Sequence, residues 1–304
     1  MPLVSIVTNA RNGSKFLPGL FDTIDKQTHT NWEHIFFDNN STDNTREICE
    51  SRESKICYFK SDKNLPLSVA RNLALEKCSG KYIAILDCDD LWEPNKIEYQ
   101  TNILEENKDF DICTTDYSTL VQNEMIKASP AKAKNINFQY MLVNYLICHS
   151  SVVFRATMLR SINEYYDPNL HVAHDKEFIL RLLINHKIYH INSYLSVWRH
   201  TNKSLTNSRF DLLAKDNEYI INKFEKLVLN FKKLYSKQVT LLNYKINFHY
   251  AIFYWKENNA NKSRLHLKKR IWHPKFFIFY IVTLLISSSA YNLVSKLYIK
   301  LKGK

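Results

Sequence analysis

The sequence predicts an α/β protein with a mostly parallel, mixed sheet flanked by helices, followed by an all-helical C-terminal region. Short β-rich runs alternate with segments of helical spacing as far as Thr115, and this alternation is typical of βαβ units and a parallel sheet. From Phe210 onward only helical patterns remain. We therefore expect a domain over residues 1–205 and a helical region over residues 206–304.

Each predicted element follows from a local pattern. The predicted strands of the first part are short apolar runs at 4–8, 34–37, 56–59, 82–86 and 110–115. Helices are expected between them at 16–27, from Ser41 or Thr42 to 51, at 67–77, and after Glu93-Pro94, where proline suits a first turn. Further along, the patterns predict an edge hairpin at 117–128, a helix at 137–146, a strand at 150–155, an apolar helix opened by His174-Asp175, and strands over 188–199.

Composition excludes several kinds of protein. The chain has 304 residues and only four glycines, which rules out a GxGxxG loop and a Walker A loop. Its six cysteines form no CxxC pair, so a structural zinc site or a disulfide framework is not expected and a reducing cytoplasm is favoured. The N-terminus has neither the charged segment nor the long apolar segment of a signal peptide.

Three carboxylates, Asp87, Asp89 and Asp90, follow the apolar run 82–86 directly. Crowded acids repel one another unless a cation lies among them. Two other polar clusters, Thr8–Asn12 and Asp38–Asp43, also follow predicted strands, and parallel strands bind ligands at their carboxyl ends. Helix capping can explain one such cluster, but it explains three together poorly. The sequence therefore predicts a metal site that faces a phosphate-bearing ligand.

Several motifs occur in the order of a known family. They are VSIVTNARN, FDNNSTDNT, LPLSVARNLALEKCSGKYIAILDCDDLWEP, HSSVVFR, HDKEFILRL and WRHTNKS. Over about residues 3–205 the chain resembles the inverting glycosyltransferases of family 2, which have the GT-A fold, and in particular those of bacterial cell-surface polysaccharide synthesis. The resemblance implies a nucleotide-diphosphate sugar donor, a saccharide acceptor and a divalent cation, Mn²⁺ or Mg²⁺.

The resemblance also implies a role for each matching residue. Asp175 would be the general base, and Asp89 would bind the metal together with Asp87, which can alternatively reach the ribose. Thr8 and Asn12 would line the nucleotide pocket, and Asp38 and Asn39 would face the nucleotide base. Arg71 would lie near the diphosphate, and Asp90 would support the metal shell or face the donor sugar. Arg199 and His200 would lie near the diphosphate or the metal.

The chain departs from the family pattern at three places. Asn9-Ala10-Arg11 stand where Pro-Thr-Tyr is common. Asn39 replaces an acid that often pairs with uracil, so a UDP-sugar donor is less strongly indicated, and dTDP and GDP donors stay open. His174 replaces the glutamate that often precedes the base. We expect it to be a surface residue, with a supporting role beside Asp175 as the alternative.

The C-terminal tail is basic and apolar. Of the net charge of +12, ten Lys and Arg lie in residues 262–304, which contain no acid, and residues 276–294 are uncharged. A nucleic-acid binder would more often spread its charge along a groove. We expect interfacial or re-entrant helices on anionic lipid, with a transmembrane span or a dimerisation helix as alternatives.

Together these features predict an inverting glycosyltransferase at the cytoplasmic face of the inner membrane. It would act on a lipid-linked saccharide, with no nucleic-acid partner. Two other classes remain open at this stage: a nucleotidyltransferase, and a catalytically silent scaffold in a membrane complex that assembles glycans.

Overall fold

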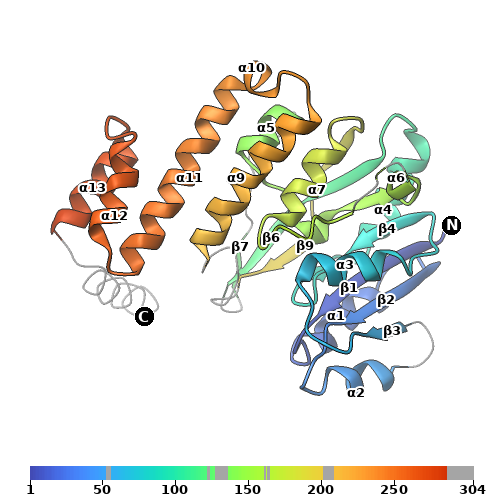
Figure 1. Cartoon of the computed structure of the whole chain (residues 1–304). Coiled ribbons are helices and arrows are strands. Elements are labelled where there is room, and N and C mark those ends of the chain that lie inside the picture. The colour runs from blue at the N-terminus through green and yellow to red at the C-terminus, as the bar shows by residue number, and fades with distance from the viewer. Residues whose placement is uncertain are drawn as a thin grey trace. The chain divides into compact units, whose positions relative to one another are not determined.

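The computed structural model describes residues 1–52, 56–121, 124–126, 136–160, 162, 165–200 and 209–285. The chain forms two compact units, Met1–Thr201 and Asn202–Lys304, which are described separately (Figure 1). The boundary predicted near residue 205 falls in 201–208, outside the described residues.

One half of the sheet in the first unit is parallel. Its strands are ordered β3-β2-β1-β4, and helices connect them, as βαβ units require. The bounds are β1 Val4–Ala10, α1 Leu17–Asp25, β2 Trp32–Asp38, α2 Thr45–Glu50, β3 Ile56–Lys60, α3 Leu67–Leu75 and β4 Tyr82–Ile85. This half confirms the alternation that the sequence predicts.

The other half of the sheet is mixed. It continues from β4 in the order β8-β6-β9-β5, with β7 beside β6. The pairs β4–β8, β6–β8, β6–β7 and β5–β9 are antiparallel, whereas β6–β9 is parallel. The bounds are β5 Leu91–Trp92, α4 Lys96–Glu106, β6 Ile112–Val121, β7 Glu124–Ile126, α5 Phe138–Val143, β8 Val153–Arg155, α6 Thr157–Arg160, α7 His174–Leu182 and β9 Ile188–Arg199.

The register of the parallel strands places three loops together. Ala10, the last residue of β1, pairs with Asp38, the last residue of β2, and Val7 of β1 pairs with Ile85 at the end of β4. The sheet is anchored on one face by buried side chains of α1 and α4, including Leu20. All three polar clusters predicted from the sequence therefore follow strands that end at the same edge.

Some element boundaries differ from the prediction. The helix expected from Ser41 or Thr42 begins at Thr45, because Ser41 and Thr42 form hydrogen bonds with Asn12 in the loop after β1. The strand expected at 150–155 is a 3₁₀ turn at His149–Ser151 followed by β8. The two-residue strand β5 was not predicted, since it is too short for a periodic pattern.

The second unit is helical throughout its described part. Its helices are α9 Phe210–Leu227, α10 Phe231–Leu234, α11 Ser236–Lys256, α12 Ala260–Lys268 and α13 Pro274–Leu285. Helix α11 packs against α9 and α12, and α12 packs against α13 (Figure 1). Helices α11, α12 and α13 share a small core of Ala251, Leu267 and Phe276.

The apolar segment predicted at 276–294 begins within α13. Residues 286–294 and the amphipathic face predicted beyond them lie outside the described residues. Within the part of the chain that the structure describes, no helix combines the length and apolar character needed to cross a bilayer.

Candidate active site

Side chain–backbone hydrogen bonds join the loops after β1 and β2. Asn12 has a left-handed backbone, with a φ of 55°, and its Oδ1 accepts the Thr42 N–H at 2.9 Å. The Asn12 N–H donates to Ser41 Oγ at 2.9 Å, and the Ser14 N–H donates to Asp43 Oδ2 at 3.0 Å. The two predicted polar loops are therefore side by side, with Asn12 exposed at their junction.

Asp38 and Asn39, at the end of β2, are held by bonds within the protein. Asp38 is fully buried, and its carboxylate accepts the Ser41 N–H at 2.7 Å and the Tyr58 hydroxyl at 2.6 Å. The Asn39 carboxamide pairs with both backbone groups of Leu65: it accepts the N–H and donates to the carbonyl, each at 2.9 Å. These bonds shape the loop, and contact of either side chain with a nucleotide base stays a prediction.

Thr8 and Asn9 are consecutive on β1 and so point to opposite faces of the sheet. The Thr8 hydroxyl is fully buried, 3.0 Å from Nε2 of His34, and burial lowers the pKa of His34 to about 3. Asn9 instead lines a cavity, where its buried Nδ2 has no hydrogen-bond partner among the described residues. The polar side chain of β1 that lines the cavity is thus Asn9, which the sequence marks only as a departure from the family pattern.

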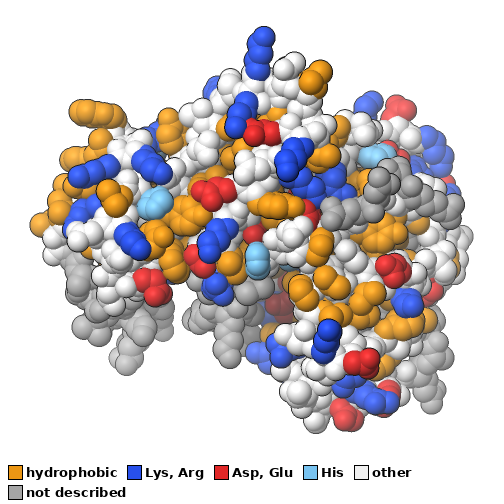
Figure 2. Space-filling view, in the orientation of Figure 1, with side chains coloured by type: hydrophobic (Ala, Val, Ile, Leu, Met, Phe, Trp, Pro, Cys, Tyr) orange, Lys and Arg blue, Asp and Glu red, His pale blue; other side chains and the backbone are white. Residues whose placement is uncertain are grey.

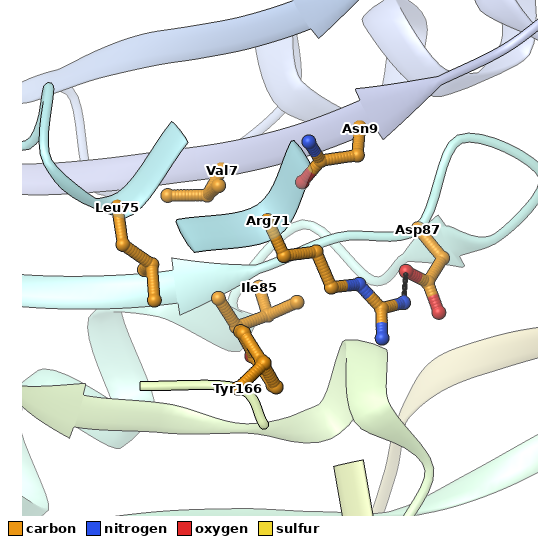
Figure 3. Close-up of a pocket in the computed structure, with 7 residues that line it drawn as sticks. All are labelled: Val7, Asn9, Arg71, Leu75, Ile85, Asp87 and Tyr166. Atoms are coloured by element: carbon orange, nitrogen blue, oxygen red, sulfur yellow. Dashed lines mark hydrogen bonds and ion pairs between the residues drawn. The ribbon is translucent and has the colours of Figure 1, made fainter. Parts of the chain in front are cut away.

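Figure 3 shows this cavity beside Arg71 and Asp87. The residues that line it are Val7, Asn9, Arg71, Leu75, Ile85, Asp87 and Tyr166.

Arg71, on α3, lies at the centre of the site with 7% of its surface exposed. Its Nη2 donates to Asp87 Oδ1 at 2.5 Å, its Nη1 contacts Nε2 of His174, and its guanidinium lies 5.6 Å from the centre of the Tyr166 ring. Burial opposes the charge, but nearby groups, with the Asp87 carboxylate foremost, raise the pKa of Arg71. A charged guanidinium therefore connects the acidic end of β4 with the start of α7.

The three carboxylates after β4 have different surroundings. Asp87 is bound to Arg71. Asp90 is 2% exposed and accepts the Ser150 hydroxyl at 2.5 Å and the Arg199 N–H at 2.9 Å; burial and the two neighbouring acids raise its pKa well above the usual range. Burial and the Asp87 charge raise the pKa of Asp89 to about 6. Asp90 thus connects the loop that carries Asp87, Asp89 and Asp90, here called the acidic loop, to β9, while Asp89 is the acid that a cation would stabilise.

The donor set fits a divalent cation of the magnesium or manganese type. Such ions prefer oxygen ligands and bind through one or two carboxylates together with phosphate and water. Asp89 and Asp87 supply two carboxylates, and the burial and the Asp87 charge that disfavour the ionised form of Asp89 are effects that a bound cation would offset. Within the described ranges, no three His, Cys, Asp or Glu side chains form a metal cluster, so ligand oxygens would have to complete the coordination.

Arg199 and His200 lie where β9 ends. Arg199 donates from Nε to the backbone carbonyl of Asp89 at 2.8 Å, and its guanidinium lies 5.4 Å from the Phe16 ring centre. The His200 ring packs against Trp198 with 5.6 Å between centres. Arg199 therefore supports the acidic loop, and metal ligation by His200 stays a prediction.

Asp175 occupies the first turn of α7. Its Oδ1 accepts the N–H of Lys176 at 2.8 Å. Burial raises the pKa of Asp175 to about 6, although the Arg71 charge acts in the opposite direction. A carboxylate that titrates near neutral pH suits a general base.

Several buried residues beside Arg71 and Asp175 were not predicted. His174 is 4% exposed, so the prediction of a surface residue is wrong. The Tyr166 hydroxyl lies 2.9 Å from Nε2 of His149, and the Tyr145 hydroxyl is buried with no hydrogen-bond partner in the described part of the chain. Only His174, which stands directly before Asp175, had a sequence signal that could have identified it.

Comparisons with known proteins agree with this geometry. A sequence model of "Glycosyl transferase family 2" matches residues 5–166. The putative teichuronic acid biosynthesis glycosyltransferase TuaG of Bacillus subtilis (strain 168) is 28% identical over 236 residues, which cover 74% of this chain and 90% of TuaG. WfgD of Escherichia coli, a UDP-Glc:α-D-GlcNAc-diphosphoundecaprenol β-1,3-glucosyltransferase, is 30% identical over 216 residues, covering 70% of this chain and 83% of WfgD.

The fold also has counterparts among solved structures. The mannosyltransferase PcManGT from Pyrobaculum calidifontis, in complex with GDP-Man and Mn²⁺, superposes with a TM-score of 0.64 at 13% identity, covering 97% of this chain and 88% of that one. This likeness confirms the predicted GT-A type of α/β fold. Since the family match spans more than half of the 304 residues, the chain belongs to glycosyltransferase family 2.

Proposed function

We propose that this glycosyltransferase is metal-dependent and inverting, and that it transfers a sugar from a nucleoside-diphosphate donor to a hydroxyl of a lipid-linked saccharide. The observation that carries this proposal is the position of Arg71. Its guanidinium touches Asp87 at the acidic end of β4 and His174 at the start of α7, where Asp175 follows. The acidic end of β4, which suits a metal-bound diphosphate, and the segment that carries the proposed base thus both contact the guanidinium of Arg71.

In the proposed reaction, the acceptor hydroxyl gives its proton to Asp175 as its oxygen bonds to the anomeric carbon. The bond from that carbon to the donor phosphate breaks, and the nucleoside diphosphate leaves with the electron pair. Attack from the face opposite the leaving group inverts the anomeric configuration. Arg71 stabilises the developing negative charge of the diphosphate, and a divalent cation held by Asp89 and Asp87 would supply further charge stabilisation there.

The names of the relatives suggest the substrates. WfgD is named for UDP-glucose and a diphosphoundecaprenol-linked acceptor, and TuaG for teichuronic acid biosynthesis. By analogy we infer an acceptor linked to a lipid diphosphate, and a role in surface polysaccharide biosynthesis. Asn39 carries no charge and its carboxamide is paired with Leu65, so it does not select one base, and uracil, thymine and guanine stay possible.

We also infer that the helical unit attaches the enzyme to the cytoplasmic face of the inner membrane. Around α13 several apolar side chains are exposed: Trp272 by 95%, Ile278 by 62% and Leu285 by 77%. Hydrophobic and basic side chains are interspersed over α12 and α13, at the left of Figure 2. A mixed basic and apolar surface of this kind suits anionic lipid.

The reaction can be tested with the purified full chain, Mn²⁺, a GlcNAc-diphosphate lipid acceptor in detergent, and UDP-, dTDP- and GDP-sugars in turn. We expect one donor to yield nucleoside diphosphate and an extended lipid, and Asp89→Ala to lose this activity. Asp22→Ala, which removes an exposed carboxylate of α1, is the matched control and should keep it. Release of pyrophosphate would instead indicate a nucleotidyltransferase, and no turnover of any donor would favour a silent scaffold.

A further inference from the structure

His174 makes an unusual contact with the central cation of the site. It is the first residue of α7, is 4% exposed, and presents its Nε2 to Nη1 of Arg71. Because a guanidinium has only N–H donors, Nε2 must be the acceptor in this hydrogen bond. The single ring proton is therefore on Nδ1, and the imidazole is neutral.

The surroundings keep His174 neutral. Burial lowers its pKa well below the usual value, and the Arg71 charge and neighbouring His149 act in the same direction. Its Nδ1 is buried and has no hydrogen-bond partner within the described residues. An unsatisfied buried N–H destabilises a fold, so the stability of the fold alone does not explain a histidine at this position.

The consequence for Arg71 is both geometric and electrostatic. Nη1 is held by His174 and Nη2 by Asp87, while the Tyr166 ring lies against the guanidinium. The plane of the guanidinium is thus fixed from two sides. His174 is uncharged and adds no negative charge beside Arg71, whose ion pair is with Asp87. An acid at position 174 would place a second negative charge on the guanidinium and weaken its attraction for a phosphate.

We propose that His174 is a positioning residue: as a neutral hydrogen-bond acceptor, it orients Arg71 toward the donor diphosphate and leaves its positive charge available. This inference rests on the proposed function, because that function assigns a diphosphate to Arg71. It concerns affinity for the donor rather than proton transfer, which belongs to Asp175.

The test compares three substitutions in the full chain. Glutamine places an amide oxygen near the position of Nε2, so His174→Gln should keep the affinity for nucleoside diphosphate with Mn²⁺. His174→Leu removes the acceptor and His174→Glu adds a charge. Each should weaken binding of nucleoside diphosphate roughly 10- to 100-fold, the range for a lost hydrogen bond to a charged group, and should raise the KM for the donor more than it lowers kcat. Thermal unfolding of the leucine variant should match that of the wild type.

The control is His186→Gln, at a half-buried histidine beyond the C-terminal end of α7 that is paired with Asp111. It should change neither affinity nor KM. Wild-type donor affinity in the leucine and glutamate variants would overturn the role of His174, and so would a loss of affinity in the glutamine variant. Either result would leave the proposed function standing. If the wild type bound none of UDP, dTDP and GDP with Mn²⁺, the proposed function would fail, and this inference with it.

Discussion

At the scale of single residues, Asp175 is subject to opposing influences. Burial disfavours its charged form and raises its pKa to about 6, whereas Arg71 and the backbone N–H groups favour the charged form. Its place in the first turn of α7 also favours a negative charge. The balance leaves a carboxylate that is ionised at neutral pH yet basic enough to accept a proton in the transition state.

Transfer should therefore depend on pH through Asp175. Because a general base must be ionised, kcat/KM should fall about tenfold per pH unit below about pH 6 and be level above it. Asp175→Asn should lose roughly 10²- to 10⁴-fold in kcat and keep its affinity for nucleoside diphosphate. Both can be measured by nucleoside diphosphate release and by calorimetric titration. Near-normal turnover of this variant would show that another group is the base.

The same pKa makes a separate prediction about stability. A carboxyl whose pKa is near 4 in the unfolded chain and about 6 in the folded chain binds its proton more tightly when folded. Its contribution to the free energy of unfolding should therefore fall as pH rises from about 4 to about 6. Urea unfolding of the wild type and of Asp175→Asn across this range should show a difference that grows in favour of the asparagine variant. A difference that is constant with pH would contradict the raised pKa.

Sequence patterns identify where site residues lie along the chain better than which way they point. Asp87, Asp89 and Asp175 all lie near Arg71 or the acidic loop, as strand ends and a helix start lead one to expect. Thr8 is different, because strand alternation gives two faces without saying which of them holds the cavity. The burial of His174 also depends on a contact 103 residues away along the chain, which no local pattern contains.

At the scale of elements, the parallel half of the sheet is predictable because helices connect its successive strands. The mixed half is less so. β8 has three residues, and β5 has two, so pairing across the sheet rather than intrinsic preference decides their structure. The 3₁₀ turn before β8 has a similar origin: Ser150 within it donates to Asp90, and its carbonyl accepts the Trp92 indole N–H.

One side chain joins α3 to the segment before α7. The carboxamide of Asn72 donates to the carbonyl of Tyr166 and accepts its N–H, both at 2.8 Å. The Asn72 side chain thus satisfies both backbone groups of Tyr166, as a neighbouring strand would. The pairing also holds the Tyr166 ring against Arg71. The contact thus determines the shape of the cavity from outside it.

Asn72→Ala should therefore destabilise the fold and weaken donor binding together. Loss of both bonds leaves two backbone groups of Tyr166 without partners, which should lower the free energy of unfolding by about 1–3 kcal/mol, as measured by urea denaturation. The KM for the donor should rise as well. Asn31→Ala, at an exposed position on the same unit, should change stability by less than about 0.5 kcal/mol. Equal effects of the two substitutions would mean that the pairing with Tyr166 adds neither stability nor donor affinity.

At the scale of the whole molecule, charge and chemistry are divided between the two units. The acids of the site belong to the first unit, whereas the segment 262–304 holds ten basic residues and no acid. On α13 the two faces also differ. Phe276 and Thr283 are buried, while Phe277, Ile278, Leu284 and Leu285 are exposed on the other side. An apolar stripe turned away from the helical core is what a lipid surface would stabilise.

Membrane attachment should therefore depend on exposed side chains that the fold does not need. In the full chain, combined Trp272→Ser, Phe277→Ser and Ile278→Ser substitutions should reduce co-sedimentation with vesicles that contain phosphatidylglycerol. Lys268→Gln, Lys269→Gln and Lys275→Gln together should weaken binding by up to about 3 kcal/mol, at roughly 1 kcal/mol per charge near the surface. High salt should lower wild-type binding in the same way, and deletion of residues 262–304 should abolish it.

The matched control is Leu229→Ser, at a leucine that is 85% exposed in the loop between α9 and α10; it should bind vesicles as the wild type does. Transfer to a short, water-soluble acceptor analogue should be unchanged in every substituted variant, because none of these side chains belongs to the active site. Undiminished sedimentation of the deletion variant would mean that residues 1–261 hold the enzyme on the membrane. The deletion variant could lose binding while wild-type binding depends neither on salt nor on anionic lipid. That result would assign the attachment to the apolar stripe alone, since the basic residues contribute only through charge.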